Sequence, residues 1–421
     1  MKNVSKKGQR ISRLMEVNEL SEEQRRFEER MTMIQTLIPL GIAAAADEMR
    51  QEAQGLIGEL YERGKSHGPW GSNRGSICLG DQKVAVAVPR VRDRQTNQEI
   101  PLTSYQRLQS AGVLEQLALK RVINGVSMGK YEDAAQAVPE TFGISRDAVS
   151  RRWIRASAKK LAALNERSLE RYDIVAMFLD GKHFSMDHEI VVALGVTMTG
   201  EKVILGMVET STENYAVCRD FIRGLMDRGL RTAEPILCVI DGGKGLHKGL
   251  KDVLGDQAVI QRCQWHKREN VLKYLPKARQ AEFRRKLQGA YEQPTYDDAK
   301  KQLNRIKAEL RGMNLSAVNS LEEGFEETLT LHRLGLFEKL GRSFKTTNAI
   351  ENVNSLLGIY TDRVDYWKNS EQRQRWVATA LLTLEPRLRT LMGYQHLKQL
   401  RSTMAQCVGK RKTSVELKAA A

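Results

Sequence analysis

The sequence predicts an α/β protein in which a mixed β-sheet has helices on its faces and all-α segments precede and follow the strands. Three observations support this class. The chain has 421 residues, of which 41% are apolar, so it can bury the cores of two or three domains. Between Asp173 and His266, strand-like apolar runs follow one another and then alternate with helical patterns, which is typical of a mixed sheet. Residues 267–345 are charged, helical in pattern and poor in strand signals.

The charge balance is strongly basic. Lys and Arg number 67 against 51 Asp and Glu, a formal net charge of +16. A surplus of this size favours a polyanionic partner, either nucleic acid or an anionic membrane surface, although a merely soluble basic protein has the same composition. No apolar run approaches the roughly 20 residues of a membrane-spanning helix, and the basic start MKNVSKKGQR lacks the apolar core of a secretory signal.

The cysteines indicate a reducing compartment. There are five of them, an odd number, and they are scattered along the chain at positions 78, 218, 238, 263 and 407. This pattern fits reduced thiols better than a disulfide framework. We therefore expect a cytoplasmic protein.

The amino-terminal segment, residues 1–70, is charged and helical in pattern from Glu22 to Arg63. Residues 66–76, SHGPWGSNRGS, are predicted as a Gly/Ser-rich break. The run from Val84 to Arg94, VAVAVPRVRDR, alternates like a strand.

A helix-turn-helix is predicted within a helical stretch from Tyr105 to Leu169. Glu132–Phe142 is expected to form its first helix, Gly143 the sharp turn, and Ser145 the cap of a second helix. The apolar side of the second helix is expected to hold Ala148, Val149, Trp153 and Ile154, and its DNA-contacting arginines are Arg146, Arg151, Arg152 and Arg155. The alternative is an ordinary helical hairpin with a solvated basic face.

From Asp173 the patterns predict the order strand, strand, strand, helix, strand, helix, strand. The first strand, IVAMFLDG, ends in Asp180, and the fourth, PILCVIDGG, ends in Asp241. The second and third strands, EIVVALGVTMTGEKVILGMVE, are joined by a Thr-Gly turn. The last strand is AVIQRCQWH, and the two helices are STENYAVCRDFIRGLMDRGL and GLHKGLKDVL.

Asp180 and Asp241 are predicted to meet. In a sheet of this order the first and fourth strands lie side by side and parallel, so their carboxyl ends project both aspartates into one crevice. Two close carboxylates repel unless a hard cation such as Mg²⁺ lies between them. Glu351, beside the apolar stripe of the helix TTNAIENVNSLLG, is the candidate third ligand, and Gly181, Gly242 and Gly243 are small enough to let a nucleic-acid backbone approach.

Each of these acids also has an ordinary structural explanation. Asp241 could cap the helix that starts near Lys244, Glu351 could form a capping-box-like pair with Asn348, and Asp180 could start a turn. The hypothesis of a common site depends on all three occurring in this order.

The spacing Cys263-x-x-His266 also permits the hypothesis of a zinc site. It suits a metal ligand pair, and His183 and His188 could complete a zinc site. We expect Cys263 to pack as a small apolar group, with His266 directed toward the site or DNA. Trp265 is more typical of a core residue than of a surface that stacks on bases.

These segments together resemble the DDE transposases of bacterial insertion sequences, in the Mutator-like family. The matching pieces are LDGKHF, VIDGGKGL, CQWHKRENV and TTNAIENVNS, and the resemblance covers roughly Asp173 to Leu391. It implies an RNase H-like core with an all-α insertion before the glutamate helix. The expected organisation is 1–70, a charged helical segment; 71–170, a DNA-binding region; 171–266, the first part of the core; 267–345, the insertion; 346–395, the final core helices; and 396–421, a basic tail.

The resemblance also implies a function. Asp180, Asp241 and Glu351 would be the catalytic triad, holding two Mg²⁺ ions that Mn²⁺ can replace, and Cys263 and His266 would be the family's C-x-x-H signature. The implied reaction is cleavage at inverted terminal repeats in double-stranded DNA and strand transfer into target DNA. A homodimer or larger assembly, associated with the bacterial nucleoid and not with a membrane, is expected. The alternatives are a non-catalytic helix-turn-helix regulator and an RNase H-like nuclease without strand transfer.

One departure from the family concerns DNA contacts. Many DDE enzymes place Lys or Arg about two helical turns after the glutamate, but position 358 is Gly and the next basic residue is Arg363. The segment DYWKNSEQRQRW offers Lys368, Arg373 and Arg375 as phosphate contacts. With Arg363, Lys244 and His266 they complete the candidate DNA-binding residues of the core.

Overall fold

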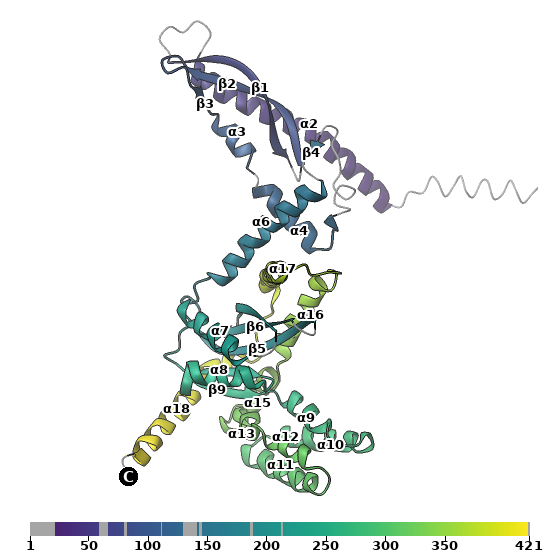
Figure 1. Cartoon of the computed structure of the whole chain (residues 1–421), viewed down its shortest axis with the longest axis vertical. Coiled ribbons are helices and arrows are strands. Elements are labelled where there is room, and N and C mark those ends of the chain that lie inside the picture. Colours follow the sequence, from purple (N-terminus) through teal and green to yellow (C-terminus); the bar gives the residue numbers. More distant parts are fainter. Residues whose placement is uncertain are drawn as a thin grey trace, which may run out of the picture. The chain divides into compact units, whose positions relative to one another are not determined.

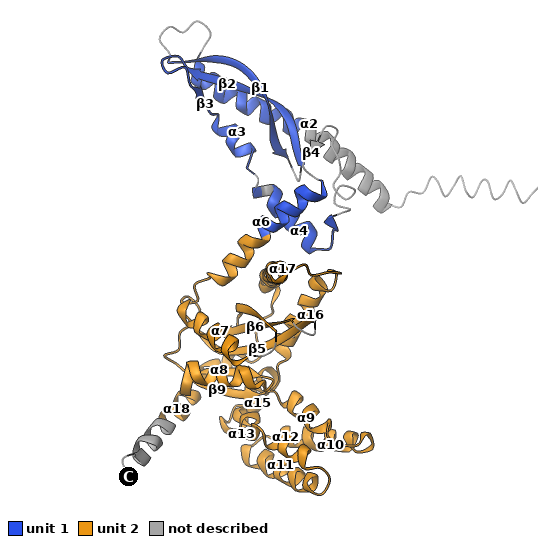
Figure 2. Cartoon of the chain, in the orientation of Figure 1, with its two compact units in different colours: residues 1–156 blue, residues 157–421 orange. Residues whose placement is uncertain are grey.

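The computed structural model describes residues 22–58, 66–79, 82–110, 112–128, 141–142, 145–185, 188–211 and 214–419. The chain divides into two compact units, residues 1–156 and 157–421 (Figure 2). We describe each unit by itself. Within the described residues, no helix is both long enough and apolar enough to cross a membrane.

The first unit is built on a hairpin and a long helix. The helix is α2 (Glu22–Ile57), and the sheet consists of β1 (His67–Leu79), β2 (Gln82–Asp93), β3 (Glu99–Ile100) and β4 (Thr141–Phe142). The helix α2 lies along the hairpin of β1 and β2 (Figure 1). Met49 and Ala53 of α2 pack in one apolar cluster with Val88 and Val91 of β2. The strand predicted from Val84 is thereby confirmed, since its alternate valines face this core.

The stretch predicted as a Gly/Ser-rich break is instead strand β1, apart from its first residue. It pairs antiparallel with β2 along almost its whole length, with a register shift between Pro69 and Ser72. Its glycines serve the strand. Gly71 has a φ of +82° at the register shift, and a Cβ on Gly75 would lie 2.5 Å from the Tyr105 hydroxyl. A bulge at Gly71 and the close approach of Tyr105 at Gly75 therefore explain these glycines, which in the sequence suggested a break between elements.

The predicted helix-turn-helix is only partly described. Its second helix is present as α6 (Arg146–Asn165), which follows α3 (Thr103–Leu108) and α4 (Gly112–Ile123). The predicted first helix, Glu132–Phe142, is wrong at its last two residues. Thr141–Phe142 form the strand β4, which pairs with Lys83 and Val84 of β2. Residues 129–140 and Gly143 lie outside the described residues. On α6, Val149 and Trp153 are buried as expected, whereas Ile154 is exposed.

The second unit contains a five-stranded mixed sheet in the order β7-β6-β5-β8-β9. The strands are β5 (Ile174–Ser185), β6 (His188–Thr197), β7 (Lys202–Thr210), β8 (Ile236–Ile240) and β9 (Ala258–Arg262). The first three are antiparallel neighbours, whereas β8 runs parallel to both β5 and β9. The predicted mixed sheet, with its first and fourth strands side by side and parallel, is confirmed.

Helices cover both faces of this sheet. On one face, Met177, Leu179 and Cys238 pack in one apolar cluster with Ile222 of α7 (Tyr215–Asp227) and Leu250 of α8 (Lys244–Leu254). Because side chains alternate along a strand, Phe178 points to the opposite face, where its ring stacks on Phe344 of α15 (Phe337–Phe344). The helices α16 (Asn348–Thr361) and α18 (Leu397–Ala419) also contact β5, and α17 (Ser370–Leu384) contacts β7. The segment expected as a basic tail is therefore largely the helix α18, whose Leu397, Leu400 and Met404 are buried.

Residues 267–345 are helical, as predicted, and have a core of their own. The helices are α9 (Gln264–Leu272), α10 (Lys277–Tyr291), α11 (Tyr296–Arg311), α12 (Leu315–Glu322), α13 (Phe325–Thr328), α14 (Thr330–Arg333) and α15. Phe283, Leu287, Leu303 and Leu321 are among the residues that pack in this core. Because α9 begins at Gln264, the last strand ends four residues earlier than predicted.

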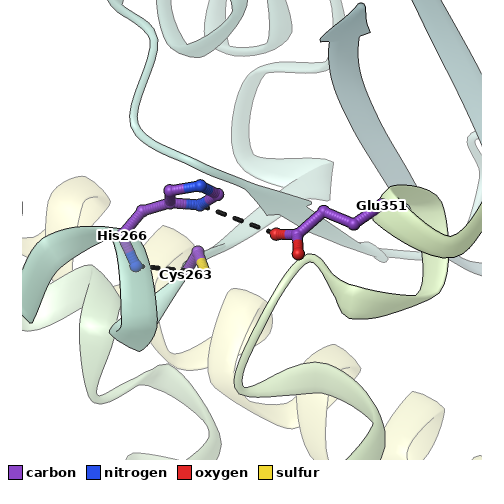
Figure 3. A group of neighbouring side chains, drawn as sticks. All are labelled: Cys263, His266 and Glu351. Atoms are coloured by element: carbon purple, nitrogen blue, oxygen red, sulfur yellow. Dashed lines mark hydrogen bonds and ion pairs between the residues drawn. The ribbon is translucent and has the colours of Figure 1, made fainter. Parts of the chain in front are cut away.

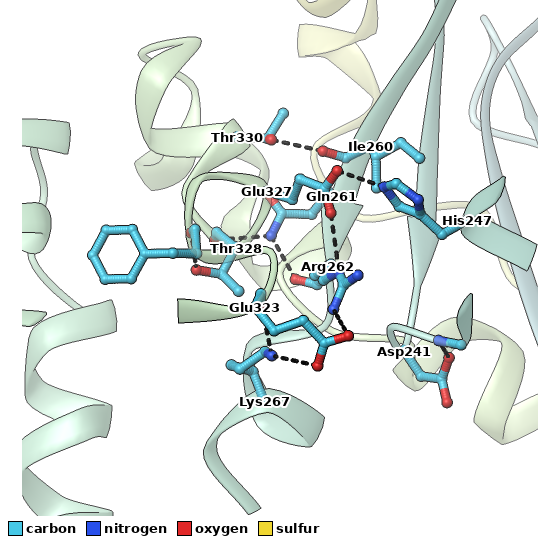
Figure 4. Close-up of polar contacts among 12 residues, drawn as sticks. Asp241, His247, Ile260, Gln261, Arg262, Lys267, Glu323, Glu327, Thr328 and Thr330 are labelled. Atoms are coloured by element: carbon cyan, nitrogen blue, oxygen red, sulfur yellow. Dashed lines mark hydrogen bonds and ion pairs between the residues drawn. The ribbon is translucent and has the colours of Figure 1, made fainter. Parts of the chain in front are cut away.

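Buried amide and hydroxyl groups attach the helical insertion to the edge strand β9. The side-chain amide of Gln261 donates to the carbonyl of Thr328 at 3.0 Å, and the Thr330 hydroxyl donates to the carbonyl of Ile260 (Figure 4). The side-chain amide of Gln264 donates to the same Thr328 carbonyl at 2.9 Å. Buried polar groups are costly unless they are hydrogen-bonded, so these bonds fix how α13 and α14 meet the sheet.

Charged groups reinforce the same attachment. Arg262 is buried and pairs with Glu327 of α13 at 2.9 Å, and the other carboxylate oxygen of Glu327 lies 2.7 Å from His247 of α8 (Figure 4). The ammonium of Lys267 is also buried and donates to the carbonyls of Ser320 and Glu323. Burial is the main reason that the pKa of Lys267 falls to about 8.

Replacing Gly324 with alanine is expected to weaken this attachment. Gly324 has a φ of +63°, and a Cβ there would lie 2.4 Å from Nε of the buried Arg262. We expect a loss of about 1–3 kcal/mol in the free energy of unfolding, seen as a fall of several degrees in the unfolding temperature. The matched control is Gly289→Ala on α10, where a Cβ would meet nothing within 4 Å. It is expected to be neutral or slightly stabilising, and equal effects of the two changes would contradict this interpretation.

Candidate active site

Asp180 and Asp241 lie at the same level on neighbouring parallel strands. The pairing of β5 with β8 reaches Phe178 opposite Val239, and each aspartate comes two residues after these partners. β8 ends at Ile240, as predicted, but β5 continues to Ser185, so Asp180 lies within its strand. The strand continues because β6 pairs with it along the far edge, where Asp180 is opposite Val192. Beyond Phe178 the edge of β5 that faces β8 is therefore open.

Glu351 reaches the same place from the first turn of α16. Three residues further along that helix, the Asn354 amide donates to an Asp180 carboxylate oxygen at 2.8 Å. Glu351 itself accepts a hydrogen bond from the Thr347 hydroxyl at 2.5 Å. Thr347, rather than Asn348, is thus the local partner of Glu351.

The charges of the other two carboxylates act on Asp180. Burial raises the pKa of Asp180 to about 7, and the negative charges of Asp241 and Glu351 act in the same direction. The charge of His266 and the hydrogen bond from Asn354 oppose this rise. Asp180 therefore lies among like charges, in the arrangement that a bound cation would stabilise.

Asp241 is held in place by the backbone that follows it. Its carboxylate accepts a hydrogen bond from the Gly243 N–H at 2.9 Å. Gly243 is the N-cap of α8, so Asp241 lies outside the capping position that the ordinary explanation required. Between them Gly242 has a φ of +116°, which favours glycine, and a Cβ there would lie 3.1 Å from the Arg262 guanidinium.

Gly181 has a different role from the one predicted. The space that its Cβ would occupy holds the carboxylate of Glu189, which is buried on β6. The glycine therefore makes room for a side chain of the protein and not for a nucleic-acid backbone. Burial raises the pKa of Glu189; nearby His183 opposes this rise, and the charge of Asp241 adds to it.

Cys263 and His266 face Glu351 across the site (Figure 3). The Cys263 sulfur is buried and accepts hydrogen bonds from the His266 N–H at 3.5 Å and the Thr347 hydroxyl at 3.4 Å. The imidazole Nδ1 of His266 lies 3.9 Å from a Glu351 oxygen. Cys263 is the main reason that the pKa of His266 rises to about 9, despite burial, and the charges of Asp241 and Glu351 add to it. Burial acts to raise the pKa of the Cys263 thiol, but the hydrogen bonds outweigh it and lower that pKa.

The zinc site considered from the sequence does not assemble in this structure. Three possible ligand atoms, one each from Cys263, His266 and Glu351, lie within 4.8 Å of one another. His183 and His188 lie elsewhere, 3.8 Å from Glu189 and 3.5 Å from Glu209 respectively. The two histidines are therefore engaged by other carboxylates, away from the thiol.

Comparison with known proteins decides the family. A family model described as "Transposase, Mutator family" matches residues 15–386, most of the chain. The chain belongs to the Mutator family of transposases. The resemblance predicted from the acidic segments and the C-x-x-H pair is thereby confirmed.

Individual relatives agree with this membership. The transposase of insertion sequence element ISRM5 from Rhizobium meliloti is 26% identical over 303 residues, covering 70% of this chain and 73% of the relative. The transposase of IS256 in transposon Tn4001 from Staphylococcus aureus is 25% identical, covering 72% and 77%. The transposase of IST2 from Acidithiobacillus ferrooxidans is 29% identical over a shorter stretch, 47% of this chain and 64% of the relative.

In this Mutator-family transposase, the basic residues predicted to contact DNA fall into two groups. The exposed ones are Arg146, Arg151, Arg155, Lys244, Arg363 and Lys368, of which Arg155 also pairs with Glu115 at 2.8 Å. In the other group, Arg152 is only 5% exposed, and Arg373 is buried against Glu209 at 2.7 Å. Arg375 is likewise buried and paired with Glu371. For Arg152, Arg373 and Arg375 this burial argues against the predicted DNA contacts, because helix packing and ion pairing already occupy their side chains.

Three residues of the candidate site were not singled out from the sequence. Asn354 and Thr347 bond Asp180 and Glu351, and Lys182 donates to the Asn354 carbonyl at 3.3 Å. The Lys182 ammonium also lies 3.1 Å from where a Cβ of Gly358 would be, the helix position at which a basic residue was expected. Simple periodicity could have found them, since Thr347 and Asn354 are one turn from Glu351 on its helix, and Lys182 is two residues from Asp180 on its strand.

Trp265 was predicted to be a core residue, and this is wrong. It is 46% exposed at the start of α9, where its ring meets the His266 ring edge-on at 4.8 Å between centroids. The neighbouring positions Gln264 and Lys267 are buried instead, because their polar ends bond backbone carbonyls of the insertion.

Proposed function

We propose that this Mutator-family protein is a DDE transposase with an RNase H-like catalytic core. The order β7-β6-β5-β8-β9, with parallel pairing only around β8, supports the fold. The observation that supports the chemistry is the meeting of three acidic segments far apart in the sequence. Asp180 and Asp241 follow paired residues of the parallel strands β5 and β8, and the helix that carries Glu351 bonds Asp180 through Asn354. A DNA-binding regulator would have no need for three acids at one sheet edge.

The donor atoms present fit Mg²⁺ better than a softer metal. Asp180, Asp241 and Glu351 offer carboxylate oxygens, which are the ligands that Mg²⁺ and Mn²⁺ prefer. Among the described residues, the carbonyl oxygen of the Asn354 side chain is buried beside Asp180 and has no hydrogen-bond partner. It offers a further oxygen to a hydrated cation. The Cys263 thiol is a poor ligand for these ions, and its hydrogen bonds give it a structural role.

The residues around the carboxylates would fix their orientation. Asn354 holds one oxygen of Asp180, Gly243 one of Asp241, and Thr347 one of Glu351. The remaining oxygens are left for two Mg²⁺ ions, which when bound ionise the attacking hydroxyl and stabilise the leaving oxygen. His266, whose raised pKa keeps its imidazole charged near neutral pH, would lie close to the DNA phosphate.

The proposed reaction has two steps of the same type. A water oxygen attacks the phosphorus at the element's end, the bond to the 3′ oxygen breaks, and a free 3′-hydroxyl remains. That hydroxyl then attacks a phosphorus of target DNA. The bond from this phosphorus to the 3′ oxygen of the target strand on its 5′ side breaks, and that strand departs with a free 3′-hydroxyl, while the strand on the 3′ side is joined to the element's end. The scheme requires neither a covalent protein–DNA intermediate nor a nucleoside triphosphate.

The remaining parts would bind DNA. Exposed Arg146 and Arg151 at the start of α6 are the candidate contacts to the inverted terminal repeats, and Lys244, Arg363 and Lys368 to phosphates near the core. The net charge of +16 supports a DNA partner. Because two element ends react together, we propose a homodimer or a larger assembly.

The test is Asp241→Ala in an assay of cleavage and joining, with terminal-repeat DNA identified in the sequence flanking the gene. Removing a metal-binding carboxylate costs several kcal/mol of transition-state stabilisation, so we expect both activities to fall by roughly 1,000-fold or more. DNA binding should remain close to that of the wild type. Normal cleavage and joining by the variant would contradict the proposal. If the wild type cleaves without joining it is a nuclease, and if it neither cleaves nor joins it is a regulator.

A further inference from the structure

The exposed Trp265 lies beside a hollow that the proposed chemistry does not use. The hollow has a volume of about 170 Å³, room for several water molecules at about 30 Å³ each or for one planar ring system. Its lining comes from α9, α10 and the link between α15 and α16: Gln264, Trp265, Arg268, Gln288, Tyr291, Glu292, Lys345 and Thr346. An aromatic side chain thus borders a cavity that is rich in hydrogen-bonding groups.

The hollow lies on the Glu351 side of the candidate active site. Thr346 in its wall precedes Thr347, whose hydroxyl bonds Glu351. Trp265 precedes His266, whose ring it touches, and His266 lies 3.9 Å from Glu351. The Gln264 N–H donates to the Lys345 carbonyl at 2.9 Å, which ties the two walls together. A group bound in the hollow would therefore lie next to the part of the site that holds His266 and Glu351.

The polar side chains of the hollow are held in place by one another. Arg268 donates to Gln288 at 3.3 Å and to Glu269 at 3.0 Å, and Gln288 donates to Glu292 at 2.9 Å. The cavity is thus preformed, which lowers the cost of ordering it around a ligand. Its charges are mixed, because Arg268, Lys345 and Glu292 all line it. A phosphate would meet the Glu292 carboxylate, whereas a neutral planar ring with donors and acceptors on its edge suits all of these groups.

We infer that this hollow, which we call the Trp265 pocket, binds an unstacked nucleobase next to the phosphate that is cut. The inference rests on the proposed function for the position of the DNA. A base inside a duplex cannot reach a side pocket, so it must come from a frayed end or a single-stranded tail. Stacking on an aromatic side chain contributes about 1–3 kcal/mol per base without reading its identity.

The experiment compares two fluorescein-labelled DNA probes by anisotropy, without divalent metal. One is a short blunt duplex, and the other is the same duplex with a single-stranded 3′ tail of thymidines. Trp265→Ala is expected to weaken binding of the tailed probe by about tenfold and to leave blunt binding nearly unchanged. Trp265→Phe should retain most of the tail affinity. The matched control is Tyr274→Ala, which removes an aromatic side chain of similar exposure, 50%, from a different hollow, and it should leave both probes unaffected.

Photocrosslinking with 5-iodo-deoxyuridine in the tail should label the peptide that contains Trp265. Equal effects on both probes, an equal loss in Tyr274→Ala, or labelling elsewhere would overturn the inference. So would a change in oligomeric mass in Trp265→Ala without loss of tail binding, since that would assign the pocket to a second copy of the chain. These measurements need no metal and no cleavage. They can therefore contradict the base-binding inference while the Asp241→Ala test supports the proposed function, and they can support the inference while that test contradicts the function.

Discussion

Asp180→Asn is expected to abolish cleavage and joining and, at pH 8 without metal, to raise the unfolding temperature of the second unit. The catalytic loss follows from the proposed metal site, which needs the Asp180 charge. The gain in stability follows from burial and from repulsion by Asp241 and Glu351, which together raise the pKa of Asp180 to about 7. Asparagine has nearly the same shape, removes the charge and can still accept the hydrogen bond from Asn354.

The pH dependence gives the sign of this effect. In the unfolded chain Asp180 loses its proton near pH 3.8, whereas in the folded protein it keeps the proton until about pH 7. The folded state therefore binds more protons across this range, and stability falls as the pH rises from about 4 to about 7. The loss is on the order of a few kcal/mol and is complete above pH 7. Mg²⁺ should offset it in the wild type and have little effect in Asp180→Asn, as measured by calorimetry from pH 4 to pH 8.

A control for general charge removal lies near the start of the same strand. Asp173 pairs with Arg401 at 2.6 Å and is about half exposed. Asp173→Asn removes a favourable pair, so it should leave stability unchanged or lower it by up to about 1 kcal/mol. If Asp180→Asn lowered the unfolding temperature at pH 8 as much as this control, the like-charge account of the site would be wrong.

Thr347→Val should reduce metal-dependent cleavage by about 10–100-fold, the range observed when a residue that orients a metal ligand is lost. Thr347 is fully buried, and its hydroxyl meets the Cys263 sulfur at 3.4 Å, His266 Nδ1 at 3.3 Å and a Glu351 oxygen at 2.5 Å. Valine keeps the shape but leaves Glu351 without its donor. The defect should appear as a higher Mg²⁺ concentration for half-maximal activity. Thr347→Ser keeps the hydroxyl and should have the Mg²⁺ requirement of the wild type.

Thr361→Val separates this role from simple stability. Thr361 is buried at the end of α16, ten residues after Glu351, and its hydroxyl lies 3.1 Å from the Leu357 carbonyl and 3.2 Å from an Asp362 oxygen. It should cost a similar amount of stability with no change in the Mg²⁺ requirement. Two results would show that Thr347 has no positioning role. One is a normal Mg²⁺ dependence of Thr347→Val, and the other is a Thr347→Ser protein with the same defect as Thr347→Val.

The sheet and the meeting of its two aspartates could be predicted because local patterns determine them. Apolar runs that end in Asp180 and Asp241 fixed two strands, and the order of the elements made those strands parallel neighbours. The helix that carries Glu351 could be predicted because it has a regular apolar stripe. Sequence patterns also gave the helical character of residues 267–345 and the second helix of the predicted helix-turn-helix.

What could not be predicted depends on partners distant in sequence. The space beside Gly181 is filled by the Glu189 carboxylate on the next strand. The buried Arg373 donates a hydrogen bond to Glu209, more than 160 residues away in the sequence. The strand β1 exists because β2 pairs with a stretch whose own composition suggests a break. Trp265 is exposed because the polar side chains beside it, Gln264 and Lys267, bond buried carbonyls of the insertion. Such tertiary contacts outweigh residue preferences, so sequence patterns alone misplace these residues.

The most direct test of the account is a crystal structure of the full chain with terminal-repeat DNA and Mn²⁺, located by anomalous scattering. The account predicts manganese between Asp180, Asp241 and Glu351, with a DNA phosphate on its open side. Manganese held by the two aspartates while the Glu351 carboxylate points away from them, or no manganese at this sheet edge, would contradict it.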